Sequence, residues 1–200
     1  MATDYAGAVR TGAMAAGRLH RTLGTRALIE SRAGAVDVFG AIASLDLPLL
    51  LRPLHGLLGA FLNEPIPGIL VTTERSMSIQ RFTAAHELGH FSLDHQPSLD
   101  DDSILRRMPT SPEPTGHFEE AEADAFAVAF MMPKWLILAH CSRQGWQIAD
   151  LRRPEIVYQL SLRMGASYEA TCRTLVRYEL IAFADMQSLR QTAPRLLKST

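Results

Sequence analysis

Residues 83–90 read Thr-Ala-Ala-His-Glu-Leu-Gly-His and contain a His-Glu-x-x-His pattern formed by His86, Glu87 and His90. Residues four apart lie on one face of a helix, one turn above each other. Both imidazoles can therefore point at one ion, and Glu87 lies at the rim of the same site. In a chain of 200 residues with 7 histidines, chance predicts about 0.01 copies of this pattern. The stretch therefore predicts a helix that supplies two ligands to a metal ion.

A zinc peptidase also needs a third protein ligand, an open coordination position for water, and a carboxylate beside that water. Glu87 fits the last role, as a general base that takes a proton from the water. The third ligand is expected from a second helix that begins near Phe118. Its Glu120 and Asp124 share a face, so Glu120 can bind the metal while Asp124 orients a ligand histidine. Glu122 is a competing ligand on another side of this helix.

The rest of the chain predicts an α+β fold that is mostly helical, with a small β-sheet packed on the pair of metal-binding helices and a helical C-terminal part. The β-branched run Ile69–Thr73 is typical of a strand, and Leu47–Leu51 is a second candidate strand. Prolines and polar residues over 94–118 indicate a loop. Within it we expect Asp100–Asp102 to form a solvated turn rather than a second metal site.

These patterns divide the chain into three regions. They are an N-terminal helical region with a candidate strand (1–68), a zinc metallopeptidase core (69–134) and a C-terminal helical region (135–200). In the last region, helices are expected over 153–164 and 167–184, with Gly165 in the turn between them. This is the outline of a helix-turn-helix. Two helices joined by a glycine turn are common, however, so we favour the simpler interpretation that they close the domain.

Composition excludes several other classes of protein. A hydrophobic content of 47% and a charged content of 20% are typical of a folded globular chain. The net charge of -1 gives the whole chain no strong attraction to nucleic acid, although residues 141–200 carry a net charge of +4. Cys141 and Cys172 form no Cys-x-x-Cys pair, which favours a reducing compartment. We recognise no signal peptide or membrane span, so we expect a cytoplasmic protein with no membrane partner.

The two metal-binding stretches resemble the ImmA/IrrE-type zinc metallopeptidases. The matching residues are Arg81–His90 with His95 shortly after, Glu120–Ala127, and the Met131-Met132-Pro133 that ends the second helix. Ala166–Ala170 is similar to a weaker signature of the same family. In the family's pattern the first glutamate of Glu-x-x-Ala-Asp is the third zinc ligand, and by position this is Glu120. Two histidines and a carboxylate also favour Zn²⁺ over other divalent ions.

The resemblance implies a small sheet flanked by helices, with the two motif helices facing each other across zinc held by His86, His90 and Glu120. It also implies a cytoplasmic endopeptidase whose partner is a helix-turn-helix transcriptional repressor. Better-understood members cleave such repressors and so switch on genes of mobile elements or stress responses. For the donor that stabilises the oxyanion, the sequence offers candidates but no basis for a choice: His95, His117, His140 and Tyr158.

Three non-catalytic alternatives remain open. In the first, the chain is a degenerate peptidase that binds zinc for structure or sensing and cleaves nothing. In the second, it binds a repressor without cutting it. In the third, the C-terminal helices bind DNA directly, and DNA is the less favoured partner. Glu87 argues against all three, because a scaffold needs no carboxylate beside its metal. A salt-dependent shift of duplex DNA would support the third alternative.

Overall fold

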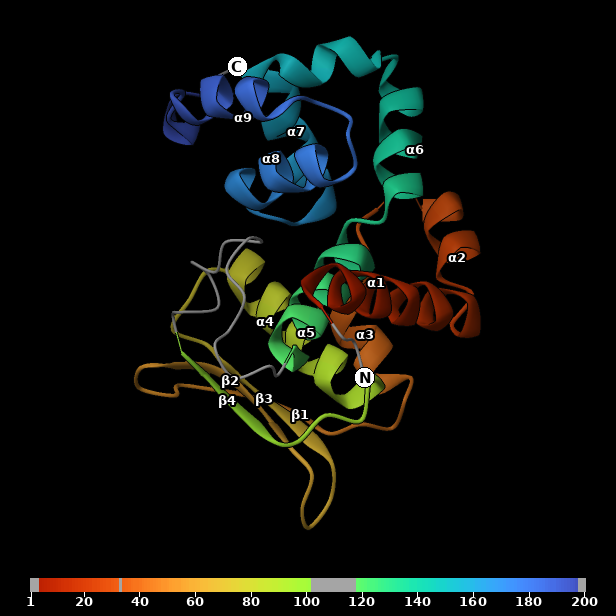
Figure 1. Ribbon diagram of the computed structural model, residues 1–200, viewed down its shortest axis with the longest axis vertical. Coiled ribbons are helices and arrows are strands. Elements are labelled where there is room, and N and C mark those ends of the chain that lie inside the picture. Colours follow the sequence, from red (N-terminus) through yellow and green to blue (C-terminus); the bar gives the residue numbers. More distant parts are fainter. Residues whose placement is uncertain (1–3, 33, 102–117, 198–200) are drawn as a thin grey trace.

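The computed structural model describes residues 4–32, 34–101 and 118–197. A β-sheet forms one end of the molecule, helices are stacked on one of its faces, and the C-terminal helices form the opposite end (Figure 1). Helices predominate, and the sheet is small and of mixed direction. The α+β class predicted from the sequence is therefore confirmed.

The described residues up to 43 are mainly helical. Their helices are α1 (Tyr5–Thr22), α2 (Thr25–Arg32) and α3 (Val38–Ala43). Aspartates precede two of them: Asp4 accepts a hydrogen bond from the Gly7 amide at 2.5 Å, and Asp37 accepts one from the Gly40 amide at 2.9 Å. Each aspartate satisfies an amide of the first turn that has no partner within the helix, which fixes where the helix begins.

The sheet consists, in the described part of the chain, of β1 (Leu49–Arg52), β2 (Leu57–Leu62), β3 (Gly68–Thr72) and β4 (Ser98–Asp101). The strand order is β1-β3-β2-β4. β3 pairs in parallel with β1, whereas β2 pairs antiparallel with both β3 and β4. β1 and β4 are therefore the edges of the sheet.

β4 lies inside the stretch 94–118, which the sequence predicts to be a loop, so this part of the prediction is wrong. A segment with consecutive aspartates has a low intrinsic preference for strands. It becomes a strand here because residues 98–101 pair with the otherwise open edge of β2. Edge strands are often short and carry charged residues. Such a segment lacks the apolar pattern by which strands are recognised in a sequence.

The two motif helices, α4 (Met77–Ser92) and α5 (Glu119–Met131), pack directly on each other. α4 lies on β2 and β3, α5 covers α4, and α1 runs along α5 (Figure 1). A β-carbon at Gly89 in α4 would lie 3.1 Å from the α-carbon of Ala123 and 3.2 Å from Phe126 in α5. The glycine therefore allows the two backbones to approach closely, which brings their ligand-bearing faces together.

The C-terminal region is helical, as predicted. Its elements are α6 (Lys134–Gln144), the 3₁₀ helix η2 (Ile148–Arg152), α7 (Pro154–Met164), α8 (Tyr168–Arg177), α9 (Phe183–Arg190) and the 3₁₀ helix η3 (Pro194–Leu197). Gly165, at a φ of 61°, ends α7, and Ser167 begins α8 by accepting a hydrogen bond from the Ala170 amide at 3.1 Å. The prediction of a single helix over 167–184 is wrong. The chain turns at Glu179, whose φ is 58°, and two helices, α8 and α9, stand in its place.

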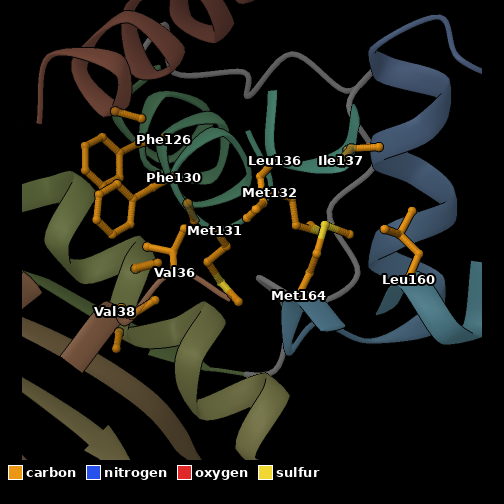
Figure 2. Packing of buried hydrophobic residues seen from close by; sticks show 14 of the residues in the cluster. Val36, Val38, Phe126, Phe130, Met131, Met132, Leu136, Ile137, Leu160 and Met164 are labelled. Atoms are coloured by element: carbon orange, nitrogen blue, oxygen red, sulfur yellow. The ribbon is translucent and has the colours of Figure 1, made fainter. Parts of the chain in front are cut away.

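The hydrophobic core continues from the motif helices into this C-terminal region (Figure 2). Phe126 and Phe130 stack with ring centroids 5.6 Å apart, and Met131 and Met132 follow them at the end of α5. Figure 2 shows the methionines between the α5 aromatic rings and apolar side chains of α6 and α7. The Met-Met-Pro segment therefore joins both parts of the core. The division of the chain at residues 68 and 134 stays a prediction.

One stretch, Glu119–Gln144, is long and apolar enough by length and composition to cross a membrane. It consists of two helices, α5 and α6, which meet at Met132 and Pro133. In its most apolar window, 61% of the residues are buried inside the fold. Core helices pass the same test of length and composition, so this stretch is weak evidence for a membrane span.

Two glycines of α1 offer a direct test of the helix packing. A β-carbon at Gly12 would overlap the carbonyl oxygen of Glu122 in α5, whereas one at Gly17 would meet only Arg21, at 3.8 Å. We expect Gly12→Ala to lower the free energy of unfolding by about 1–3 kcal/mol through overpacking. Gly17→Ala should raise it by up to about 1 kcal/mol, because alanine favours the helix. Urea denaturation followed by circular dichroism measures both, and equal effects would contradict the packing.

Candidate metal centre

Four side chains from three elements bring one possible metal-ligand atom each close together. They are His86 and His90 from α4, Asp100 from β4 and Glu120 from α5. All four ligand atoms lie within 4.8 Å of one another. Three of the residues are buried, and Glu120 is partly exposed. We call these four residues the donor set.

The predicted ligands are brought together by the contact between α4 and α5. The Nε2 atoms of His86 and His90 are 3.0 Å apart. The carboxylate of Glu120 faces both, with one oxygen 3.3 Å from His86 Nε2 and the other 3.4 Å from His90 Nε2. Two ligands bound to one ion at about 2.0–2.1 Å, the usual range for a nitrogen ligand of a small divalent metal, would be about this far apart. Their ligand roles stay predictions.

Asp100 was predicted to lie in a solvated turn, and this prediction is wrong. Its side chain is only 4% exposed, and its Oδ2 lies 3.2 Å from Nε2 of His86. Burial opposes its charged form, but the contacts with His86 hold the pKa of Asp100 below its ordinary value. Asp101, next to it, is exposed, and Asp102 lies outside the described residues. Asp100 could not be singled out in the sequence, because it stands in a run of aspartates. The pairing of β4 with β2 places its side chain in the site.

A second group of carboxylates lies behind the two histidines. Asp124 Oδ1 is 2.9 Å from Nδ1 of His86, and its role in orienting this ring stays a prediction. His95 links His90 to a second carboxylate: its Nδ1 lies 3.0 Å from His90 Nδ1, and its Nε2 lies 2.9 Å from Glu122 Oε2. Glu122, the rival candidate for the third ligand, is therefore engaged with His95. Sequence spacing did not reveal this link.

These outer partners indicate which ring nitrogens can face a cation. Nδ1 of His90 lies against Nδ1 of His95, and Nδ1 of His86 lies against Asp124. The two Nε2 atoms face each other and the Glu120 carboxylate. A cation between them would therefore meet the Nε2 atoms of both histidines.

The electrostatic environment also stabilises positive charge at this point. Burial by itself would lower the pKa of His86, but the surrounding carboxylates outweigh burial and raise this pKa well above its ordinary value. The pKa of His90 is instead lowered to about 3, by burial and by the neighbouring His86. The carboxylates therefore favour one positive charge at His86, and burial together with that charge disfavours a second one at His90. A divalent cation bound to both nitrogens fits this demand, so the residues present suit a metal.

Glu87 is fixed between α4 and the sheet, beside the donor set. Its side chain is completely buried, and Oε2 accepts a hydrogen bond from Ser98 Oγ of β4 at 3.2 Å. A β-carbon at Gly59 in β2 would lie 2.6 Å from Glu87 Oε1, so the glycine makes room for this carboxylate. Burial raises the pKa of Glu87 well above its ordinary value, although the charge of His86 opposes this rise.

The candidates for an oxyanion donor lie in different places. His95 is occupied by His90 and Glu122. His140 and Tyr158 lie on α6 and α7 in the C-terminal region, and His117 lies outside the described residues. Of the three candidates that the structure describes, His95 lies next to the donor set.

Comparison with known proteins agrees with this geometry. The sequence model of a peptidase family, described as the IrrE N-terminal-like domain, matches residues 51–176. The match covers more than half of the chain and includes α4, β4 and α5, which carry the whole donor set. The chain therefore belongs to this family of peptidases, and the resemblance to the ImmA/IrrE-type proteins is confirmed. A search of the curated proteins found no match.

The contact between Asp124 and His86 should strengthen metal binding. Loss of an outer partner of a metal-bound histidine typically costs about 10–100-fold in affinity, so we expect Asp124→Asn to weaken metal binding by this factor. Competition with a chromophoric chelator measures the change. Glu119→Gln is a matched control in the first turn of the same helix, since Glu119 does not belong to the donor set. Equal affinities of the two variants would show that Asp124 does not support the site.

Proposed function

We propose that this protein is a zinc-dependent endopeptidase that cleaves a helix-turn-helix transcriptional repressor in the cytoplasm. One observation supports the catalytic part above all others. A buried pair of imidazole nitrogens 3.0 Å apart faces the Glu120 carboxylate, with Glu87 next to His86 on the same helix. This arrangement lies in a chain that belongs to a peptidase family.

Zinc is the metal that these residues suit best. Imidazole nitrogens together with a carboxylate are common zinc ligands, whereas magnesium and calcium prefer sites made of oxygen atoms. His86, His90 and Glu120 would hold the ion. When bound, zinc supplies a Lewis acid that polarises a peptide carbonyl and lowers the pKa of a water molecule.

Glu87 is the general base in this proposal. Its carboxylate lies on the same helix as His86 and His90, next to His86, and accepts a hydrogen bond from Ser98 Oγ. It would take a proton from the attacking water and later deliver that proton to the amine that leaves the cleaved peptide bond. Ser98 and the backbone at Gly59 limit where its carboxylate can lie, so the base would be held in place.

The substrate proposal rests on the family. ImmA/IrrE-type proteins act on helix-turn-helix repressors, and cleavage of such a repressor would switch on the genes that it controls. An alternative is a non-catalytic zinc-binding regulator that binds a repressor, or DNA through the C-terminal helices. One observation favours this alternative: the donor set holds four side chains, and four protein ligands are typical of structural zinc sites. Glu87 would then have no evident task.

Replacing Glu87 by Gln tests the catalytic proposal. Glutamine has nearly the same shape as glutamate but is not a base. The rate of cleavage by Glu87→Gln should therefore be at least about 100-fold lower, which is the low end of the contribution of a general base. The variant should keep one zinc ion per chain, because Glu87 is not in the donor set. Purified protein would be incubated with zinc and a helix-turn-helix repressor as the candidate substrate, and fragments would be identified by mass spectrometry.

Glu119→Gln is the control, because it makes the same chemical change outside the donor set and should cleave at the rate of the original protein. Cleavage by Glu87→Gln at that same rate would refute the role of Glu87. Zinc in every sample without cleavage of this partner would count against the proposed substrate and would make a test of DNA binding the next step.

A further inference from the structure

We infer that Asp100 is a fourth ligand of the metal and that β4 thereby holds the site in a closed, inactive state. This inference rests on the proposed function, since it describes how that activity would be restrained. It concerns a single strand, Ser98–Asp101, which lies at the edge of the sheet beside the motif helix α4. Cleavage would require Asp100 to leave the donor set.

Side chains of β4 point alternately to its two faces, and two of them, Ser98 and Asp100, point into the site. Successive residues of a strand point to opposite faces. Ser98 Oγ is 3.2 Å from Oε2 of Glu87, and Asp100 Oδ2 is 3.2 Å from Nε2 of His86. Leu99, between them, is 69% exposed. The inward face of the strand is therefore polar and directed at catalytic groups, whereas the outward face carries the apolar residue, the reverse of an ordinary edge strand.

Asp100 stands where a catalytic site needs an open position. A catalytic zinc ion typically has three protein ligands and keeps its fourth position for water or substrate, whereas four protein ligands close a site. The ligand atoms of His86, His90 and Glu120 already form the catalytic set, and Oδ2 of Asp100 is a fourth atom within the same 4.8 Å. Asp100 would thus exclude the water on which Glu87 must act.

The backbone of β4 occupies the edge of β2 beside Glu87. An extended peptide can bind by adding a strand to an exposed sheet edge. Residues 98–101 pair antiparallel with β2, with Asp100 opposite Gly59, the residue that makes room for Glu87. A substrate that pairs with β2 at this place would have to displace β4. The pairing is irregular between Leu57 and Gly59, and such bulges are common where pairing ends beside a site.

The same strand therefore covers the base, the open metal position and the adjacent sheet edge. A single side chain, Asp100, joins β4 to the donor set, so its removal should open the site while the rest of the fold stays intact. Asp100→Ala removes the ligand, and Asp100→Asn keeps the shape of the side chain with a much weaker ligand atom. Asp101→Asn is the matched control, because Asp101 is exposed and outside the donor set.

The first measurement uses cobalt in place of zinc and needs no activity. The original protein and the three variants would be loaded with Co²⁺, and their visible absorption recorded with and without acetohydroxamate, a small ligand that needs an open metal position. We expect acetohydroxamate to change the spectra of Asp100→Ala and Asp100→Asn at concentrations at least 10-fold lower than those needed for the original protein and for Asp101→Asn. Thermal melting would show which variants are folded. Equal responses in folded proteins would overturn the assignment of Asp100 as a ligand.

The second measurement is the rate of cleavage of the helix-turn-helix partner by the zinc forms. If β4 restrains the site, Asp100→Ala should cleave at least 10-fold faster than the original protein and Asp101→Asn. Slower cleavage by Asp100→Ala would overturn the inhibitory role and make Asp100 a residue that supports catalysis. Failure of all four proteins to cleave would contradict the proposed function and with it the inhibition, whereas the cobalt spectra would still decide whether Asp100 binds the metal.

Discussion

The structure depends on one electrostatic constraint: buried ring nitrogens and carboxylates can be brought this close together only if their charges are compensated or neutralised. His86 and His90 have no solvent around their rings, and three carboxylates lie around the first of them. Isolated buried charges are costly, but charges that share a cation are stabilised. The close contact of α4 with α5 and the pairing of β4 with β2 are the packing features that make this concentration of donors possible.

Much of the site could be predicted from the sequence because it depends on local helix geometry. The four-residue spacing of His86 and His90, and of Glu120 and Asp124, fixes which side chains share a face. The contact between Asp100 and the motif helix could not be predicted in this way. It depends on which edge of the sheet a short, aspartate-rich segment joins, and strand pairing is decided by the tertiary structure rather than by the segment itself. The hydrogen-bonded link from His90 through His95 to Glu122 is hidden for the same reason.

The fold, like the site, could be predicted from the sequence only where its signals are local. Long apolar stretches such as α5 and the glycine that ends α7 were recognisable, since their signals are local. The break between α8 and α9 was not, because Glu179 adopts a left-handed conformation that its residue type does not suggest. The structure thus adds chiefly the strand β4 to the family assignment. This strand brings the Asp100 carboxylate next to His86 in the candidate metal site and the Ser98 hydroxyl next to Glu87.

The central claim is that these residues bind one metal ion at the point where α4, α5 and β4 meet. The most direct test is a crystal structure of the zinc-loaded protein with anomalous diffraction measured on both sides of the zinc absorption edge. The account predicts one strong anomalous peak per chain within about 2.0–2.2 Å of the ligand atoms of His86, His90 and Glu120. No peak at this place, or a peak elsewhere with both Nε2 atoms unbound, would contradict it.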